Sequence, residues 1–377
     1  MRAVLARRPG PTSSALRDPR PLRRPAARLA LALLLAVFPL RPQSAGRLRI
    51  YAIDVEGGKS TLYVSPSGES MLVDTGYAGN ASRDARRIVA AARAAGIRQI
   101  DYLVITHYHA DHAGGVAQLA AAFPVRAFYD HGDNYQGDPK SAPVFKAYRA
   151  VRARHPHTVL QAGDFVPVKG IRVQIVAASG RAIAATLPGA GQPNPLCASY
   201  RPIAADPGEN PRSLALLITF GQFRVADFGD LYWNQEHSLA CPADKIGAVD
   251  LYMTTHHGKK TSGSPQLVHA LHPRAAVLNN GPSSGGSAEA LQTLRSSPGF
   301  LDLWQLHFST AAGPSLNSAE AFIANPADPC SGYWIEVSAA ADASFTVANR
   351  RNQYARSYPS PASAAPAASS ASLAGRP

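Results

Sequence analysis

Three histidines and an aspartate occupy positions 107–112, whose sequence is His-Tyr-His-Ala-Asp-His. The preceding apolar segment, 100–106, is typical of a strand buried on both faces. Side chains two positions apart on extended backbone share a face, so His107 and His109 can bind one cation. Asp111 and His112 fall on the following turn and can bind a second. Imidazole and carboxylate ligands favour zinc, although manganese and iron accept the same ligands.

Two later segments offer the other groups that a pair of cations needs. Asp230 follows a strand predicted at 223–228, and its carboxylate can bridge two cations, whereas Asp227 is expected to face away. His256 and His257 follow a strand predicted at 249–255, at the strand end where sites of α/β proteins gather. One of these histidines is expected to bind the second cation, and the other to contact substrate or to support the ligands.

Four motifs in this order resemble those of the metallo-β-lactamase-fold hydrolases: VDTG at 73–76, ITHYHADHAGG at 105–115, FGD at 228–230 and HHG at 256–258. The resemblance covers about residues 49–310. The C-terminal half is most similar to the nuclease domain of DNA-uptake competence channels and to phosphorylcholine esterases. The resemblance implies an α/β fold in which a single domain forms a four-layer αββα sandwich, with the metals at the sheet edges.

The resemblance also implies a role for each site residue. Asp74 would orient the ligands from behind. The expected ligands of two divalent ions are His107 and His109 for the first, Asp111, His112 and His257 for the second, and Asp230 as the bridge. The third histidine that the family places on the first ion is missing, and Asn210 lies near its position. His131 is either its replacement or an ordinary loop histidine.

These residues predict a metal-dependent hydrolase that uses a hydroxide bridging two cations, where the pKa of water falls toward about 7. Asp111 and His256 are the expected catalytic residues. Cationic and hydroxyl groups for a small-molecule or anionic substrate, such as a phosphodiester, are offered by Lys259, Lys260, Thr261 and Ser262. Asn279 either adds an amide donor or forms a turn, and the lysines either bind substrate or lie on a solvated loop. The alternatives are a β-lactamase or other amide or ester hydrolase, and a metal-binding domain without turnover.

The positive charge of the chain is concentrated near its start. Residues 1–45 hold nine arginines against one aspartate, so they contribute +8 of the net +13 and leave +5 for the rest. No stable nucleic-acid complex is therefore expected. The same segment has an apolar run at 29–40, which is typical of an export signal and too short to span a bilayer. An uncleaved amphipathic anchor is the alternative. We expect a periplasmic or secreted protein that contacts no membrane beyond this leader.

The rest of the chain is expected to form one hydrolase domain over 47–350 and a disordered Ser/Ala/Pro tail over 357–377. With 46% apolar residues the chain can bury a sizeable core. Helices are predicted at 81–95, 113–122, 264–271 and 287–296, and hairpins at 165–177 and 213–228. A proline-rich loop at 179–212 is expected to shape substrate choice.

Cys197, Cys241 and Cys330 permit one disulfide, and their spacing does not choose the pair. The remaining histidines are expected to be structural or exposed: His155, His157, His237, His269, His272 and His307.

Overall fold

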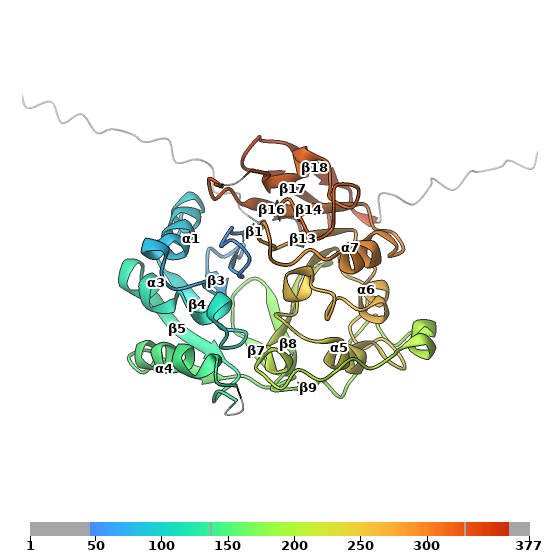
Figure 1. The fold of residues 1–377 in the computed structure, drawn as a ribbon, viewed down its shortest axis with the longest axis horizontal. Helices are drawn as coiled ribbons and strands as arrows, with labels where there is room; N and C mark the ends of the chain where they lie inside the picture. Colours follow the sequence, from blue (N-terminus) through green and yellow to red (C-terminus); the bar gives the residue numbers. More distant parts are fainter. Residues whose placement is uncertain (1–45, 136–137, 328, 362–377) are drawn as a thin grey trace, which may run out of the picture. The chain divides into compact units, whose positions relative to one another are not determined.

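The computed structural model describes residues 46–135, 138–327 and 329–361. The predicted leader and most of the predicted tail lie outside the described residues. The described part is a mixed α/β fold with two β-sheets and helices against them (Figure 1), which confirms the expected sandwich. None of the helices described is long and apolar enough to cross a membrane.

The first sheet combines the N-terminal strands with the last strands of the chain. Its order is β18 (Ala355–Tyr358), β17 (Phe345–Asn349), β16 (Ile335–Ala339), β1 (Leu48–Ala52), β2 (Thr61–Val64), β3 (Ser70–Val73), β4 (Ile100–Val104), β5 (Val125–Asp130) and β6 (His157–Val159). The strands from β3 to β6 pair in parallel, and the others pair antiparallel. The helices of this half are α1 (Arg83–Ala94), α2 (Ala110–Ala113), α3 (Val116–Ala122) and α4 (Ser141–Arg152), with a 3-10 turn η1 (Asn80–Ser82) before α1.

The second sheet has the order β15 (Ile323–Asn325), β14 (Asp302–His307), β13 (Ala275–Leu278), β12 (Leu251–Met253), β11 (Phe223–Asp227), β10 (Ala215–Phe220), β8 (Arg172–Ala178) and β7 (Phe165–Val166), and β9 (Arg181–Ala182) pairs with β8. The strands from β11 to β15 pair in parallel. The helices of this half are α5 (Trp233–Ala240), α6 (Pro265–Leu271) and α7 (Ala288–Arg295). Short 3-10 turns are η2 (Pro195–Ser199), η3 (Asn210–Arg212), η4 (Thr255–Gly258) and η5 (Glu320–Phe322).

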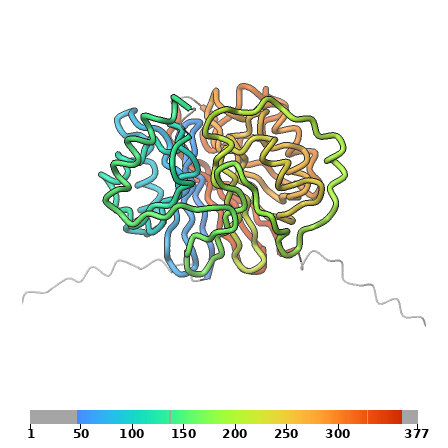
Figure 2. The backbone as a smooth tube through the Cα atoms, turned by 90° about the horizontal axis from the view of Figure 1, so that it is seen from below, coloured from blue at the N-terminus to red at the C-terminus, as the bar shows by residue number. Residues whose placement is uncertain are grey.

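Three apolar clusters show how these layers are held together. The largest contains side chains of both sheets, among them Val104, Leu216 and Trp304, so the sheets pack face to face. A second cluster joins the first sheet to α1 and α3, and a third joins the second sheet to α6 and α7. The two groups of helices lie on opposite sides (Figures 1 and 2), which gives the layer order helix, sheet, sheet, helix.

A buried ion pair also links the two halves. Lys59, which precedes β2, places Nζ 2.5 Å from Asp227 Oδ1 at the end of β11, and both side chains are fully buried. Tyr63 of β2 donates its hydroxyl proton to the other oxygen of Asp227 at 2.8 Å. Both oxygens of Asp227 are therefore engaged in these contacts and face away from the metal position. This agrees with the choice of Asp230 over Asp227 as the bridging residue.

The predicted elements agree with the structure within a few residues where apolar periodicity is strong, and both predicted hairpins are present. The boundary of the tail is wrong. Strand β18 continues through Tyr358, whose ring stacks on Phe345 and is 1% exposed, so the domain extends past residue 350 and past the predicted tail start at 357. The proline-rich loop holds only the two-residue β9 and the turns η2 and η3. Cys197, which lies in this loop, forms a disulfide with Cys241. Cys330, later in the chain, is a free thiol.

Candidate metal centre

The ends of parallel strands from both sheets meet at one edge of the sandwich. The segment 107–112 follows β4 of the first sheet, while Asp230 follows β11 and His257 follows β12 of the second sheet. The residues after these strands leave the sheets at their carboxyl ends, the place where α/β folds hold their sites. Three segments that are distant in sequence are thereby brought together.

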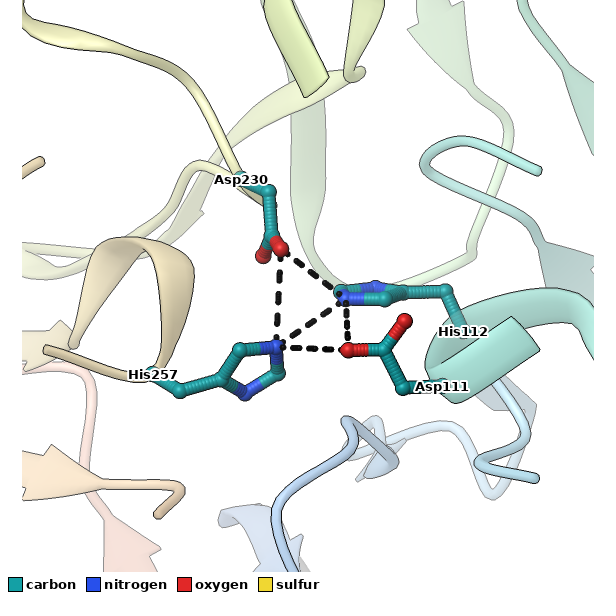
Figure 3. A group of neighbouring side chains, drawn as sticks. All are labelled: Asp111, His112, Asp230 and His257. Atoms are coloured by element: carbon teal, nitrogen blue, oxygen red, sulfur yellow. Dashed lines mark hydrogen bonds and ion pairs between the residues drawn. The ribbon is translucent and has the colours of Figure 1, made fainter. Parts of the chain in front are cut away.

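Figure 3 shows Asp111, His112, Asp230 and His257 pointing toward one another. Their potential ligand atoms all lie within 4.8 Å of each other. His112 Nε2 is 3.2 Å from Asp230 Oδ2 and 3.1 Å from His257 Nε2. His257 Nε2 is in turn 3.4 Å from Asp111 Oδ2 and 3.5 Å from Asp230 Oδ2. Such a group of nitrogen and oxygen atoms, three of whose residues are buried, can hold a divalent metal ion.

Hydrogen bonds on the far side of each ring decide which nitrogen faces the centre. His112 Nδ1 lies 2.7 Å from Asp74 Oδ2, and His257 Nδ1 lies 3.1 Å from the backbone oxygen of Asn279. The Asp74 carboxylate only accepts, so His112 Nδ1 carries a proton, and a proton on His257 Nδ1 satisfies the Asn279 carbonyl in the same way. In these neutral rings both Nε2 atoms face the centre with free electron pairs, as do the oxygens of Asp111 and Asp230. Because acceptors repel one another, this arrangement fits a cation between them.

The electrostatics of the centre also favour positive charge. Burial works against the charged form of His112, but the carboxylates of Asp230, Asp74 and Asp111 outweigh it and raise the pKa of His112 well above its ordinary value. Burial likewise works against the Asp230 carboxylate, and the surrounding imidazoles, His112 foremost, hold its pKa well below the usual range. Asp230 Oδ1 is buried, and no described residue donates a hydrogen bond to it.

His107 and His109 form a second pair beside this group. His107 Nε2 lies 3.0 Å from His109 Nδ1. The other nitrogen of His109 is 2.8 Å from Asp138 Oδ2, so the proton of this ring is on the outer side. Asp230 Oδ2 is 4.0 Å from His107 Nε2 and 3.2 Å from His112 Nε2. One carboxylate oxygen thus lies between both groups, which is the place of a bridging ligand.

Asp74 lies behind the ligand residues and is fully buried. One of its oxygens accepts the backbone proton of Thr106, and the other accepts the Thr106 hydroxyl proton and the His112 Nδ1 proton. The backbone of Asp74 is left-handed, with φ +62°, as is that of His256 and His257, with φ +51° and +55°. Left-handed backbone is unfavourable for residues other than glycine and clusters at functional sites.

His256 stands next to the group of four and faces an open cavity. Its Nδ1 is 3.0 Å from Ser262 Oγ, and its Nε2 is 3.3 Å from Lys259 Nζ and 3.5 Å from Asp230 Oδ2. Burial, with Lys259 as an additional cause, lowers the pKa of His256 to about 4 even though Asp230 opposes this. The ring is therefore neutral at pH 7, with its Nε2 electron pair directed toward the lysine and the cavity.

The cavity in front of the centre has a volume of about 630 Å³. His109, Asp111 and Asp230 contribute to its floor. Amines and hydroxyls that could bind an anion line its walls: Lys140, Lys259, Lys260, Thr261, Ser283 and Ser287. The positive charges come from both halves of the fold, because Lys140 precedes α4 and the other two lysines follow η4.

Three predicted site residues have other surroundings than expected. Ser262 and Asn279, expected to contact substrate, are 1% and 3% exposed and instead contact His256 and His257. Both the backbone oxygen and the amide group of Asn279 lie 3.1 Å from His257 Nδ1. His131, the candidate third ligand of the first ion, directs Nε2 to Glu209 at 2.9 Å. We therefore leave His131 out of the ligand set.

Several residues around the centre carry no signal in the sequence that marks them as part of a site. Asp138 and Lys140 lie before α4, in a stretch without histidine or another ligand pattern. Ser213 contacts the ring of His107 and accepts the backbone proton of Asp230. Glu209 contacts His131 and is next to Asn210, which lies near the position of the missing histidine. This closeness in sequence is the one indication that Glu209 belongs to the site.

A second group of potential ligands, Asp54, His307 and Cys330, lies apart from this centre. His307 Nε2 is 2.7 Å from Asp54 Oδ1, so this histidine is not without a partner. Arg87 donates to Asp54 at 2.9 Å and to Glu56 at 2.9 Å. Its guanidinium already balances the carboxylates, and burial raises the pKa of the Cys330 thiol to about 12. We assign these residues a structural role, in agreement with the expectation for His307.

Comparison with known proteins shows which family the first half of this centre is similar to. Residues 53–181 match the sequence profile described as the metallo-beta-lactamase superfamily. The chain contains a metallo-β-lactamase superfamily domain. The matched region includes the 107–112 segment and Asp74, and ends before Asp230.

The curated relatives include competence proteins, as the resemblance in the sequence indicates. The "Recombination protein 2" of Haemophilus influenzae is 23% identical over 239 residues, which are 62% of this chain and 24% of that protein. "Competence protein ComA" of Neisseria gonorrhoeae is 27% identical over 254 residues, 67% of this chain and 30% of that protein. The chain thus spans less than a third of the length of these relatives.

Solved structures with a similar fold include a diphosphatase of the PhnP family, at 13% identity and a TM-score of 0.36, which covers 68% of this chain and 94% of that one. Another is Zn(2+)-bound PqqB from Methylobacterium extorquens, at 12% identity and a TM-score of 0.36, which covers 62% of this chain and 89% of that one.

Proposed function

We propose that this protein is a metal-dependent hydrolase that cleaves a phosphodiester or another anionic substrate. The observation that carries the proposal is the convergence of histidine nitrogens and carboxylate oxygens beside a cavity that lysines also line. Two divalent ions, zinc by preference of the ligands, would lower the pKa of water there and polarise the electrophile. Side chains of the protein would bind the substrate and transfer protons.

Each of these residues has a position suited to its step. Asp111 is the partly exposed member of the group of four and lines the cavity, so its carboxylate can take a proton from water. His256 is neutral and can accept or pass on a proton through Nε2. Lys259 and Lys260 can hold the negative oxygens of the substrate and stabilise the charge that develops in the transition state.

The lysines favour an anionic substrate over a neutral ester. An ammonium group attracts a phosphodiester both in the ground state and in the transition state, and this attraction weakens as salt screens it. A neutral ester gains less from the same groups. Esterase activity on a neutral substrate is one alternative, and it should depend less on Lys259 and Lys260. β-Lactamase activity is the other; because β-lactams carry a carboxylate, only the choice of substrate distinguishes it.

The proposal is tested on the purified full chain with three substrates: bis-p-nitrophenyl phosphate, nitrocefin and p-nitrophenyl acetate, each with and without chelator. We expect chelator-sensitive cleavage of the phosphodiester and its loss in Asp111→Ala. Lys260→Ala should raise KM for the phosphodiester, whereas Lys169→Ala, at an exposed lysine of the β7–β8 turn, should not. Cleavage of nitrocefin alone would support the alternative, and bound metal without any turnover would support a binding domain.

We further propose that the protein works in the periplasm or outside the cell. The Cys197–Cys241 disulfide supports this location, because the cytosol keeps most thiols reduced. Fractionation of cells that express the full chain tests the location. Recovery of the protein in the cytosol, with both cysteines reduced, would refute it.

A further inference from the structure

Besides Asp230 Oδ1, a second polar atom near the first metal position has no hydrogen-bond donor among the described residues. The amide oxygen of Asn210 is buried, and no described residue donates a hydrogen bond to it. The side chain as a whole is 7% exposed. A buried carbonyl oxygen without a hydrogen-bond partner is unfavourable, so its retention calls for a further partner.

The orientation of this amide is fixed by its neighbour. Asn210 Nδ2 donates to Asp206 Oδ2 at 2.7 Å. A carboxylate oxygen only accepts, so the amide nitrogen must face Asp206, and the amide oxygen must face the other way. Asn210 lines the same cavity as His109, Asp111 and Asp230.

The backbone around Asn210 runs beside the first histidine pair. Leu214 donates its backbone proton to the carbonyl of Thr106 at 2.9 Å. Ser213 donates its backbone proton to the carbonyl of Asn210 at 3.0 Å, and its hydroxyl lies 3.3 Å from His107 Nδ1. Glu209, the preceding residue, lies near the backbone nitrogen of Tyr108, between the two histidines. Segment 209–214 is thus held against segment 106–108 on both sides of Asn210.

We propose that Asn210 Oδ1 takes the place of the missing third histidine as a ligand of the cation that His107 and His109 hold. This inference rests on the metal-binding part of the proposed function. The first cation would then have two imidazoles, the shared Asp230 carboxylate and a neutral amide oxygen. An amide oxygen is a harder donor than imidazole and suits manganese or magnesium better than a third histidine would. The first position should therefore bind zinc more weakly than the second and accept manganese.

The test measures metal binding, not turnover. The metal-free full chain is titrated with Zn²⁺ and Mn²⁺, and bound metal is counted by mass spectrometry after dialysis. We expect two zinc ions in the wild type and, in Asn210→Ala, loss of at least about tenfold in affinity for one of them. Asn210→His should bind that zinc ion more tightly and lose manganese. His107→Ala should remove the same binding step, so Asn210→Ala/His107→Ala should lose nothing more.

Controls separate a ligand from a structural asparagine. Asn352→Ala, which removes an amide at an exposed turn far along the chain, should keep both binding steps. The metal-free Asn210→Ala and Asn210→His chains should unfold at urea concentrations near that of the wild type. Unchanged affinities for both ions in Asn210→Ala, or no change of metal preference in Asn210→His, would overturn the role of Asn210. Because metal is counted directly, the result decides this role even if the wild type cleaves none of the substrates.

Discussion

His112 Nε2 and His257 Nε2 lie 3.1 Å apart, although the two residues are 145 positions apart in the chain. The outer nitrogens of these rings are bonded to Asp74 and to the carbonyl of Asn279. In the neutral rings the two Nε2 atoms therefore face each other with an electron pair each, at hydrogen-bond distance. This is unfavourable unless a cation or an added proton lies between them. The stability of this protein should thus depend on bound metal.

Removal of metal should lower the free energy of unfolding. A free zinc concentration one hundred times Kd stabilises a folded chain by about 2.7 kcal/mol for each site that binds only the folded state. Urea unfolding with and without chelator measures the difference. His257→Ala should lose most of it, whereas His272→Asn, at an exposed helix end with φ +43°, should keep it. Equal stability with zinc and with chelator would contradict the presence of a metal centre.

Asp74→Asn should weaken the second ion about 10–100-fold, because outer partners of metal-bound histidines typically contribute that much. The variant cannot accept all three protons that Asp74 receives from Thr106 and His112. Zinc titration followed by competition with a coloured chelator reports the affinity. The expectation fails if the variant folds and binds both zinc ions as tightly as the wild type.

Lys59→Met should cost about 3–5 kcal/mol of unfolding free energy, because it leaves the Asp227 carboxylate buried without its cation. Lys59→Met/Asp227→Asn should recover most of this loss, since no charge is then buried. Urea unfolding of the wild type and both variants provides the comparison. A double variant as unstable as the single one would mean that the ion pair is not the reason for the loss.

Glu236 gives the protein a pH dependence unusual for a carboxylate. Its side chain is fully buried and accepts the backbone protons of Gly263 and Ser264 at 2.7 Å, which holds the loop after Lys260. Burial outweighs these bonds and raises the pKa of Glu236 to about 7 from 4.5. The folded state therefore binds the proton more tightly, and this stability is present below pH 4.5 and is lost as pH rises through 7.

The expected size of this effect is on the order of 3 kcal/mol between pH 4.5 and pH 8. Glu236→Gln lacks the titration and keeps only one acceptor for the two amides, so it should be less stable than the wild type at pH 5. This difference in the free energy of unfolding between wild type and variant should narrow or reverse at pH 8. Urea unfolding of both chains at the two pH values measures it. A gap that is constant with pH would show that Glu236 has an ordinary pKa.

The sequence predicts those parts of the structure that are determined by residues close together in the chain. The hairpin β10–β11 follows from two apolar strands around Gly221-Gln222, and the 107–112 segment identifies a metal site by itself. Helix α4 escaped prediction because Lys140 precedes it where a capping side chain is usual. Strand β14 has six buried residues, so it shows no alternation of polar and apolar positions.

The surroundings of the site could not be read from the sequence, because they depend on contacts between distant segments. Asn279 could be assigned either an amide donor for substrate or a turn, and its position after β13 puts it behind His257. His131 was considered as a ligand, and only the fold shows its contact with Glu209. The pairing of Cys197 with Cys241 likewise requires knowledge of how the proline-rich loop packs on α5.

The most direct test of the central claim is a crystal structure of the full chain grown with zinc, with diffraction recorded on both sides of the zinc absorption edge. We predict two anomalous peaks. One should lie about 2.0–2.2 Å from ligand atoms of Asp111, His112 and His257, and the other at the same distance from His107 and His109, with Asp230 between them. No peak at these residues in crystals soaked with excess zinc would contradict the metal centre and the hydrolase built on it.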